Sequence, residues 1–60
     1  MSALSDAAGA RAAEKKAFNR HGNRSPIYQE VHRRAQEAIL KARAAGHSYA
    51  EIEAAANTEA

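Results

Sequence analysis

The chain contains no cysteine and no tryptophan, and it is poor in the residues that build large cores or sheets. The absence of cysteine excludes a disulfide framework and any zinc site made of thiolates. Its aromatic residues are one phenylalanine and two tyrosines, and its few β-branched residues show almost none of the alternation that strands require. These absences exclude an all-β domain and leave an all-α protein as the expected fold class.

Alanine takes the place of the larger apolar residues, with seventeen copies in 60 residues. Alanine favours helix strongly but buries little area. A chain of this length forms one domain at most, and folding removes only about 60% of its unfolded surface from water. We therefore expect helices around a small core.

A leader or membrane segment is also missing from the first ten residues, MSALSDAAGA. They contain neither a basic leader nor an apolar run of the length that a signal peptide or a membrane span needs. Asp6 and Glu14 argue against a transit peptide. The expected location is cytoplasmic, with no membrane partner.

The first helix is expected over residues 3–20, capped by Ser2 or Ser5 and stopped by Gly22. Its only unbroken apolar strip consists of Ala10, Ala13 and Ala17. Because such a strip offers little area, this helix is expected to dock loosely, with Phe18 as its one anchor.

The second helix is expected over residues 26–45, because Ser25 can cap it and Pro26 suits its first position. Its apolar arc consists of Ile27, Val31, Ala35, Ala38, Ala42 and Ala45, flanked by Tyr28 and Ile39. Leu40 lies far from this arc and is a candidate contact to a protein partner. A singly exposed leucine is also common on soluble proteins, so both interpretations stay open.

The third helix is expected over residues 49–56. Gly46 closes the helix before it, and Ser48 and Glu51 have the spacing of a capping box. Tyr49, Ile52 and Ala56 share a face that can pack on the arc of the second helix.

The expected architecture is thus a small helical hairpin, made by residues 26–45 and 49–56, preceded by a loosely docked helix over residues 3–20. It divides the chain into a basic, alanine-rich helix and loop (1–24) and the hairpin (25–60).

The net charge of +2 conceals an asymmetry. Residues 11–34 hold seven Lys and Arg against two acids, a net charge of +5, whereas the chain from Ala44 onward has three acids and no Lys or Arg. The candidate contacts to nucleic acid or another anionic partner are Arg11, Lys15, Lys16, Arg20, Arg24, Arg33 and Arg34. A solvated charged face explains the same pattern.

The stretch AGHSYAEIEAAAN resembles the end of the support helix, the turn and the first motif helix of bacterial helix-turn-helix DNA-binding domains. The resemblance covers about a quarter of the chain. It implies that Gly46 ends the support helix, that Ser48 caps the next helix, and that Tyr49 and Ile52 are core residues. It also implies that Asn57 takes the place of the glycine in the left-handed turn.

Two features depart from that family. Glu53 stands where such domains keep a small residue, and only three residues follow Asn57, which leaves no room for a recognition helix. Base reading by the usual route is therefore not expected.

Catalytic and metal-binding patterns are also missing. His21, His32 and His47 fall in three different predicted elements without the i,i+4 spacing of a helical zinc site. The chain has no glycine-rich phosphate loop and no nucleophile beside a base. We expect no enzyme activity, no cofactor, no metal and no small-molecule substrate.

Two functions remain. The first is a small helical protein-interaction module that acts on a transcriptional or nucleic-acid-containing assembly of phage or bacterial type. In that case Phe18 and Leu40 contact a larger protein complex or a second copy of the chain. The alternative is direct, largely non-specific binding of nucleic acid by the seven basic residues. The missing recognition helix favours the first.

Overall fold

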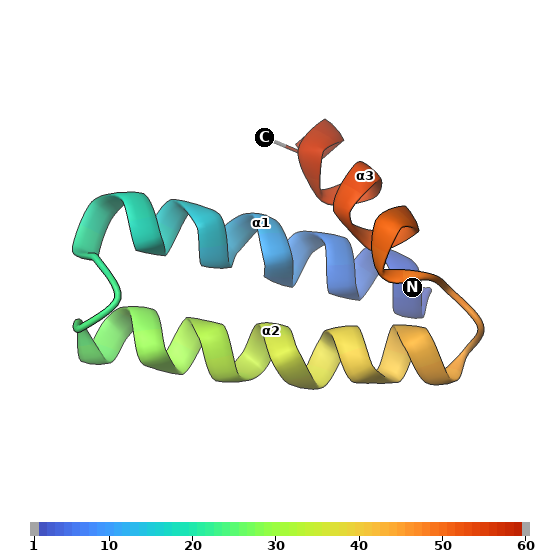
Figure 1. Cartoon of the computed structure of the whole chain (residues 1–60), viewed down its shortest axis with the longest axis horizontal. Coiled ribbons are helices and arrows are strands. Elements are labelled where there is room, and N and C mark those ends of the chain that lie inside the picture. The colour runs from blue at the N-terminus through green and yellow to red at the C-terminus, as the bar shows by residue number, and fades with distance from the viewer. Residues whose placement is uncertain (1, 60) are drawn as a thin grey trace.

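The computed structural model describes residues 2–59, and the side chains of residues 2–58. It contains three helices, α1 (Ala3–His21), α2 (Pro26–Ala44) and α3 (Tyr49–Glu59), and no strand within that range. Helices α1 and α2 run antiparallel side by side, and α3 crosses α1 near the N-terminus (Figure 1). The expected all-α class is confirmed. None of the helices in the described residues is long and apolar enough to cross a membrane.

The first two helices begin where the sequence predicts and end within one residue of the predicted positions. The Ser5 amide donates to Ser2 Oγ at 3.0 Å, and the Ile27 amide donates to Ser25 Oγ at 3.1 Å. Gly22 ends α1 with φ at 78°, and its amide donates to the Phe18 carbonyl at 2.9 Å. Glycine adopts this conformation without the steric cost that a Cβ adds.

The turn between α2 and α3 is a Schellman motif centred on Gly46, whose φ is 102°. The Gly46 amide donates to the Arg43 carbonyl at 3.0 Å, and the His47 amide donates to the Ala42 carbonyl at 3.1 Å. These two bonds satisfy carbonyls that the end of α2 leaves without helical partners.

The predicted capping box of α3 is half formed. The Glu51 amide donates to Ser48 Oγ at 3.1 Å, as expected. The Glu51 carboxylate, however, lies 3.1 Å from His47 Nδ1 instead of bonding the Ser48 amide. Helix α3 also continues to Glu59, so Asn57 is helical and does not take the left-handed conformation that the resemblance implied.

The core lies where the three helices meet, and it is built mainly of alanine. Its central cluster is Ala7, Ile39, Ala42 and Ile52, with Ala3, Leu4 and Ala38 packed against it. Ile52 is the one large side chain that is fully buried in the described range. Because the separation of packed helices depends on the side chains at their contact, alanine lets these helices approach closely.

The prediction that the N-terminal helix docks loosely is wrong. Helix α1 lies between its neighbours and contributes five buried residues, Ala7, Ala8, Ala12, Glu14 and Ala17. Helix α3 packs chiefly against α1 and makes few contacts with α2, so residues 26–45 and 49–56 do not form the packing unit that was expected. The buried strip of α1 includes Glu14, and that burial depends on partners which a hydrophobicity pattern does not show.

Candidate binding groove

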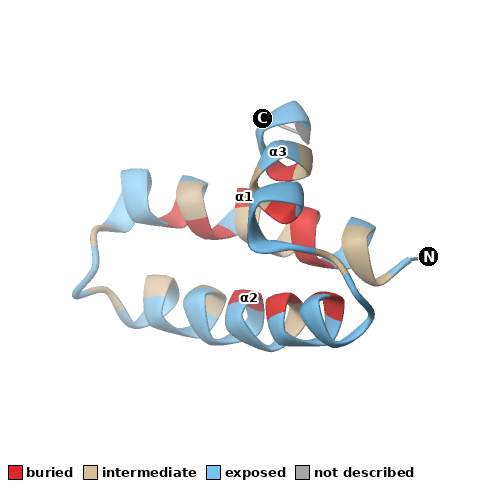
Figure 2. Cartoon of the chain, turned by 45° about the vertical axis from the view of Figure 1, so that its right-hand side comes forward, coloured by how far each residue is buried: buried red, intermediate tan, exposed pale blue. Residues whose placement is uncertain are grey.

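Helix α3 covers only one end of the α1–α2 pair. The buried residues of α2, Ala35, Ile39 and Ala42, gather in its C-terminal half, close to α3 (Figure 2). Beside α3, between α1 and α2, lies an open pocket of about 400 Å³. The lining residues, which we call the groove, are Arg11, Glu14, Lys15, Phe18, Asn19 and Tyr28.

An aromatic pair forms the apolar wall of the groove. The rings of Phe18 and Tyr28 meet edge to face, with centroids 5.6 Å apart and planes at 69°. On its other side Tyr28 stacks with His32 at 5.7 Å. Edge-to-face pairs add about 0.5–1.5 kcal/mol beyond their buried area, so this wall is held in place although half of Phe18 is exposed.

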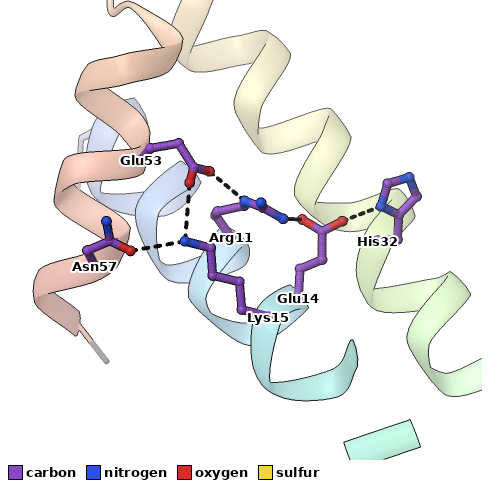
Figure 3. A network of polar contacts seen from close by, with 6 residues as sticks. All are labelled: Arg11, Glu14, Lys15, His32, Glu53 and Asn57. Atoms are coloured by element: carbon purple, nitrogen blue, oxygen red, sulfur yellow. Dashed lines mark hydrogen bonds and ion pairs between the residues drawn. The ribbon is translucent and has the colours of Figure 1, made fainter. Parts of the chain in front are cut away.

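Glu14 lies beneath the groove and is 2% exposed. Its carboxylate accepts a hydrogen bond from Arg11 Nη1 at 2.6 Å and also contacts His32 Nδ1 (Figure 3). A buried carboxylate without partners costs several kcal/mol, and removing either partner would restore part of that cost. No buried polar side-chain atom in the described part of the chain lacks a hydrogen-bond partner. The pairs of Glu14 therefore fix the floor of the groove.

Arg11 and Lys15 continue this network to α3 (Figure 3). Arg11 Nε donates to Glu53 Oε1 at 2.5 Å, and Lys15 Nζ lies 3.1 Å from Glu53 Oε2 and 3.0 Å from Asn57 Oδ1. The hydrogen bond between Arg11 and Glu53 raises the pKa of Arg11 and lowers the pKa of Glu53. The polar network thus ties α3 to α1 beside the groove.

Two more of the seven predicted cationic contacts are paired along α2. Arg33 lies 2.6 Å from both Glu30 and Glu37, and Arg34 lies 3.1 Å from Glu30. The hydrogen bond with Arg33 lowers the pKa of Glu30, and the same bond raises the pKa of Arg33. Exposed pairs of this kind contribute about 0–1 kcal/mol, and they reduce the positive field that Arg33 and Arg34 present to a partner.

The remaining predicted cations are Lys16, Arg20 and Arg24, which are exposed and have no ion pair within residues 2–58. At 100° per residue, Lys16 and Arg20 each lie about 160° around α1 from Phe18. Arg24 lies in the loop between α1 and α2. The structure does not bring the seven cations together on one surface.

The two predicted protein contacts also lie apart. Phe18 lines the groove, whereas Leu40 is 64% exposed on α2 and lies outside it. Sequence reasoning missed the roles of Glu14, Asn19 and Tyr28 in this site. One available signal was the i,i+3 spacing of Arg11 and Glu14 on the side of α1 that carries Phe18.

No group of three His, Cys, Asp or Glu side chains in the described part of the chain could hold a metal ion. The chain matches no protein family model, and no curated protein or solved structure is detectably similar to it. Any functional proposal therefore depends on the geometry of the groove and its surroundings.

Proposed function

We propose that this protein is a small helical protein-interaction module that binds a segment of a larger complex in the groove. The observation that carries the proposal is the half-exposed Phe18, packed edge to face on Tyr28, beside a pocket of about 400 Å³. Protein-binding hot spots are typically aromatic side chains held by a rigid surrounding shell. The pairs of Glu14 with Arg11 and His32 supply that shell here.

The proposed partner belongs to a transcriptional or nucleic-acid-containing assembly of phage or bacterial type. Two observations support this part. The turn at Gly46 and the cap at Ser48 lie in the stretch whose sequence resembles part of a helix-turn-helix. In addition, exposed cations at and beyond the C-terminal end of α1 would be attracted to an anionic assembly.

Direct, non-specific nucleic-acid binding is the second candidate. It is favoured by Lys16, Arg20 and Arg24, which are exposed and have no ion pair among the described side chains. Phosphate contacts from these three residues would give log affinity a slope of about −2.7 against log salt, since each contact contributes about −0.9. Sequence preference would be slight, because phosphate contacts do not read bases.

A pull-down from the source organism, with and without nuclease, tests the choice. Partners identified by mass spectrometry from the wild-type bait are compared with those from Phe18→Ala and from Ile27→Ala. Ile27 is a matched control, because it is 57% exposed on the same helix pair but does not line the groove.

We expect a protein partner that survives nuclease, disappears with Phe18→Ala and remains with Ile27→Ala. Partners that disappear with nuclease, and in a variant that combines Lys16→Gln, Arg20→Gln and Arg24→Gln, would instead support direct nucleic-acid binding. Equal loss with Phe18→Ala and Ile27→Ala would contradict the groove as the site.

A further inference from the structure

The polar groups on the groove wall offer more unused donors than acceptors. Arg11 uses Nε for Glu53 and Nη1 for Glu14, while its Nη2 has no hydrogen-bond partner within residues 2–58. Lys15 contacts one carboxylate and one amide, which leaves one of its three N–H groups available. The side chain of Asn19 has no recorded hydrogen bond in the same range.

The charged acceptor of the groove, Glu14, is by contrast already engaged. Both oxygens of Glu14 have partners, Arg11 on one and His32 on the other, and the side chain is buried. The unused donors of Arg11 and Lys15 therefore suit a ligand that supplies acceptors beside an apolar group, which can lie against Phe18 and Tyr28. Carboxylates next to large apolar side chains meet both requirements.

Helix α3 shows what this face of the α1–α2 pair already accepts. Its sequence, YAEIEAAANTE, contains three acids and no Lys or Arg. Ile52 is fully buried, and the next residue, Glu53, reaches Arg11 and Lys15. The same two cations line the groove, so the groove continues the surface on which α3 lies.

We propose that the occupant of the groove is an acidic amphipathic helix of a partner protein, which lies beside α3. One of its large apolar side chains contacts Phe18 and Tyr28, and its carboxylates bind Arg11, Lys15 and, beyond the open end of the groove, Arg24. This inference rests on the proposed function and specifies its partner. Binding of an amphipathic helix in a groove is an established mode of peptide recognition.

The test uses three synthetic peptides of about 18 residues, which is long enough for an isolated helix to form. The first has leucines at i, i+3, i+4 and i+7 and glutamates elsewhere on its polar face. The second replaces each glutamate with lysine, and the third replaces each leucine with glutamine. Affinities are measured by fluorescence anisotropy with the full chain. We expect the first peptide to bind at least about tenfold more tightly than either of the others, because one charged hydrogen bond or one apolar anchor contributes that much.

Two substitutions with opposite expected effects separate direct contact from a structural role. Lys15→Gln removes a hydrogen-bond donor and should lower the affinity for the acidic peptide about tenfold. Glu53→Gln removes the carboxylate that competes for Arg11 and Lys15, and it should strengthen binding about threefold or more. Both substitutions remove the ion pair between Lys15 and Glu53. If this pair only held α3 in place and Lys15 did not contact the peptide, both substitutions would weaken peptide binding. Weaker binding in both variants overturns the proposal.

A second matched pair tests the open end. Arg24→Gln should weaken binding of the acidic peptide about threefold, whereas Arg43→Gln should leave it unchanged, because Arg43 lies in the last turn of α2, at the other end of the molecule. Both arginines are exposed and have no ion pair among the described side chains. Each substitution removes one positive charge, so general charge attraction would weaken peptide binding equally in the two variants. Equal losses of peptide affinity in the two variants would show that binding depends on general charge attraction, and this result would overturn the proposed site.

Other occupants give different results. If the lysine peptide binds as well as the acidic one and Phe18→Ala weakens both, the acidic partner is wrong while the proposed function stands. If Phe18→Ala leaves peptide binding unchanged and the pull-down unaffected, the proposed function fails as well.

A dimer in sedimentation velocity that Phe18→Ala dissociates would identify a second copy as the occupant. Displacement of the peptide by duplex DNA would identify nucleic acid. Either result overturns the proposal that the occupant is an acidic helix.

Discussion

The two ends of the α1–α2 pair differ in what they bury and in how they use their charges. At the end that α3 covers, the core is alanine around Ile52, and the cations next to it are paired with α3. At the open end, Phe18 is 50% and Ile27 is 57% exposed, and the neighbouring Arg20 and Arg24 have no ion pair within residues 2–58. Stability is therefore concentrated at the covered end, while the groove extends from α3 toward the open end, where Phe18 is half exposed.

The small residues at the covered end explain this division. An alanine side chain contributes little area by itself, so its burial stabilises only where backbones lie close together on several sides. Helix α1 meets that condition because it lies between α2 and α3. The aromatic rings of Phe18 and Tyr28, by contrast, meet where only α1 and α2 pack.

Ile52→Ala should show the largest difference between the two ends. This is the one large side chain that is fully buried in the described range, and its removal should destabilise the fold by about 2–5 kcal/mol. A domain of this size has little more stability than that. Chemical denaturation followed by circular dichroism measures the loss.

The matched change at the open end is Ile27→Ala. We expect it to lower the free energy of unfolding by less than about 1 kcal/mol, because the side chain is mostly exposed. Equal costs for the two isoleucines would mean that the covered end is not the centre of stability.

Glu14→Gln should have the next largest effect, about 1–3 kcal/mol. The substitution keeps the shape of the side chain but weakens its charged contacts with Arg11 and His32 in a buried position. Glu37→Gln is the control, because Glu37 is also paired with an arginine but is exposed, and we expect about 0–1 kcal/mol. Urea titrations of both variants against the wild type give the comparison. If the exposed glutamate costs as much, burial does not distinguish the two pairs.

Local signals in the sequence were sufficient to predict where the three helices begin and, to within one residue, where α1 and α2 end, but not where α3 ends. Ser25 and Ser48 cap helices within three residues of their bonding partners, and Gly46 forms its motif with the residues just before it. Such interactions depend on a few adjacent residues, so a single sequence can show them.

Long-range partners were the part that could not be predicted. Glu14 and His32 are separated by 18 positions, and Arg11 and Glu53 by 42. The sequence of α1 shows only an alanine strip of small area, and it does not show that Glu14 can be buried with partners far along the chain. Phe18, a predicted protein contact, lines the groove, but its neighbours in the groove depend on the same long-range contacts.

The smallest expected effect concerns pH and the contact between Glu53 and α1. The hydrogen bond from Arg11 lowers the pKa of Glu53 below its ordinary value of 4.5. A carboxyl group whose pKa is lower in the folded than in the unfolded protein stabilises the fold above the unfolded value, and this contribution disappears as the pH falls through the folded value. Wild type should therefore exceed Glu53→Gln in stability by up to about 1 kcal/mol above pH 4.5, and the difference should shrink as the pH falls further.

Thermal melts of both proteins from pH 7 to pH 2 measure this difference in stability. Glu30 also has a lowered pKa, through Arg33, but it is present in both proteins and cancels in the difference. A difference that stays constant down to pH 2 would show that the charge of Glu53 does not hold α3 on α1, and the two ends would then differ only in their apolar packing.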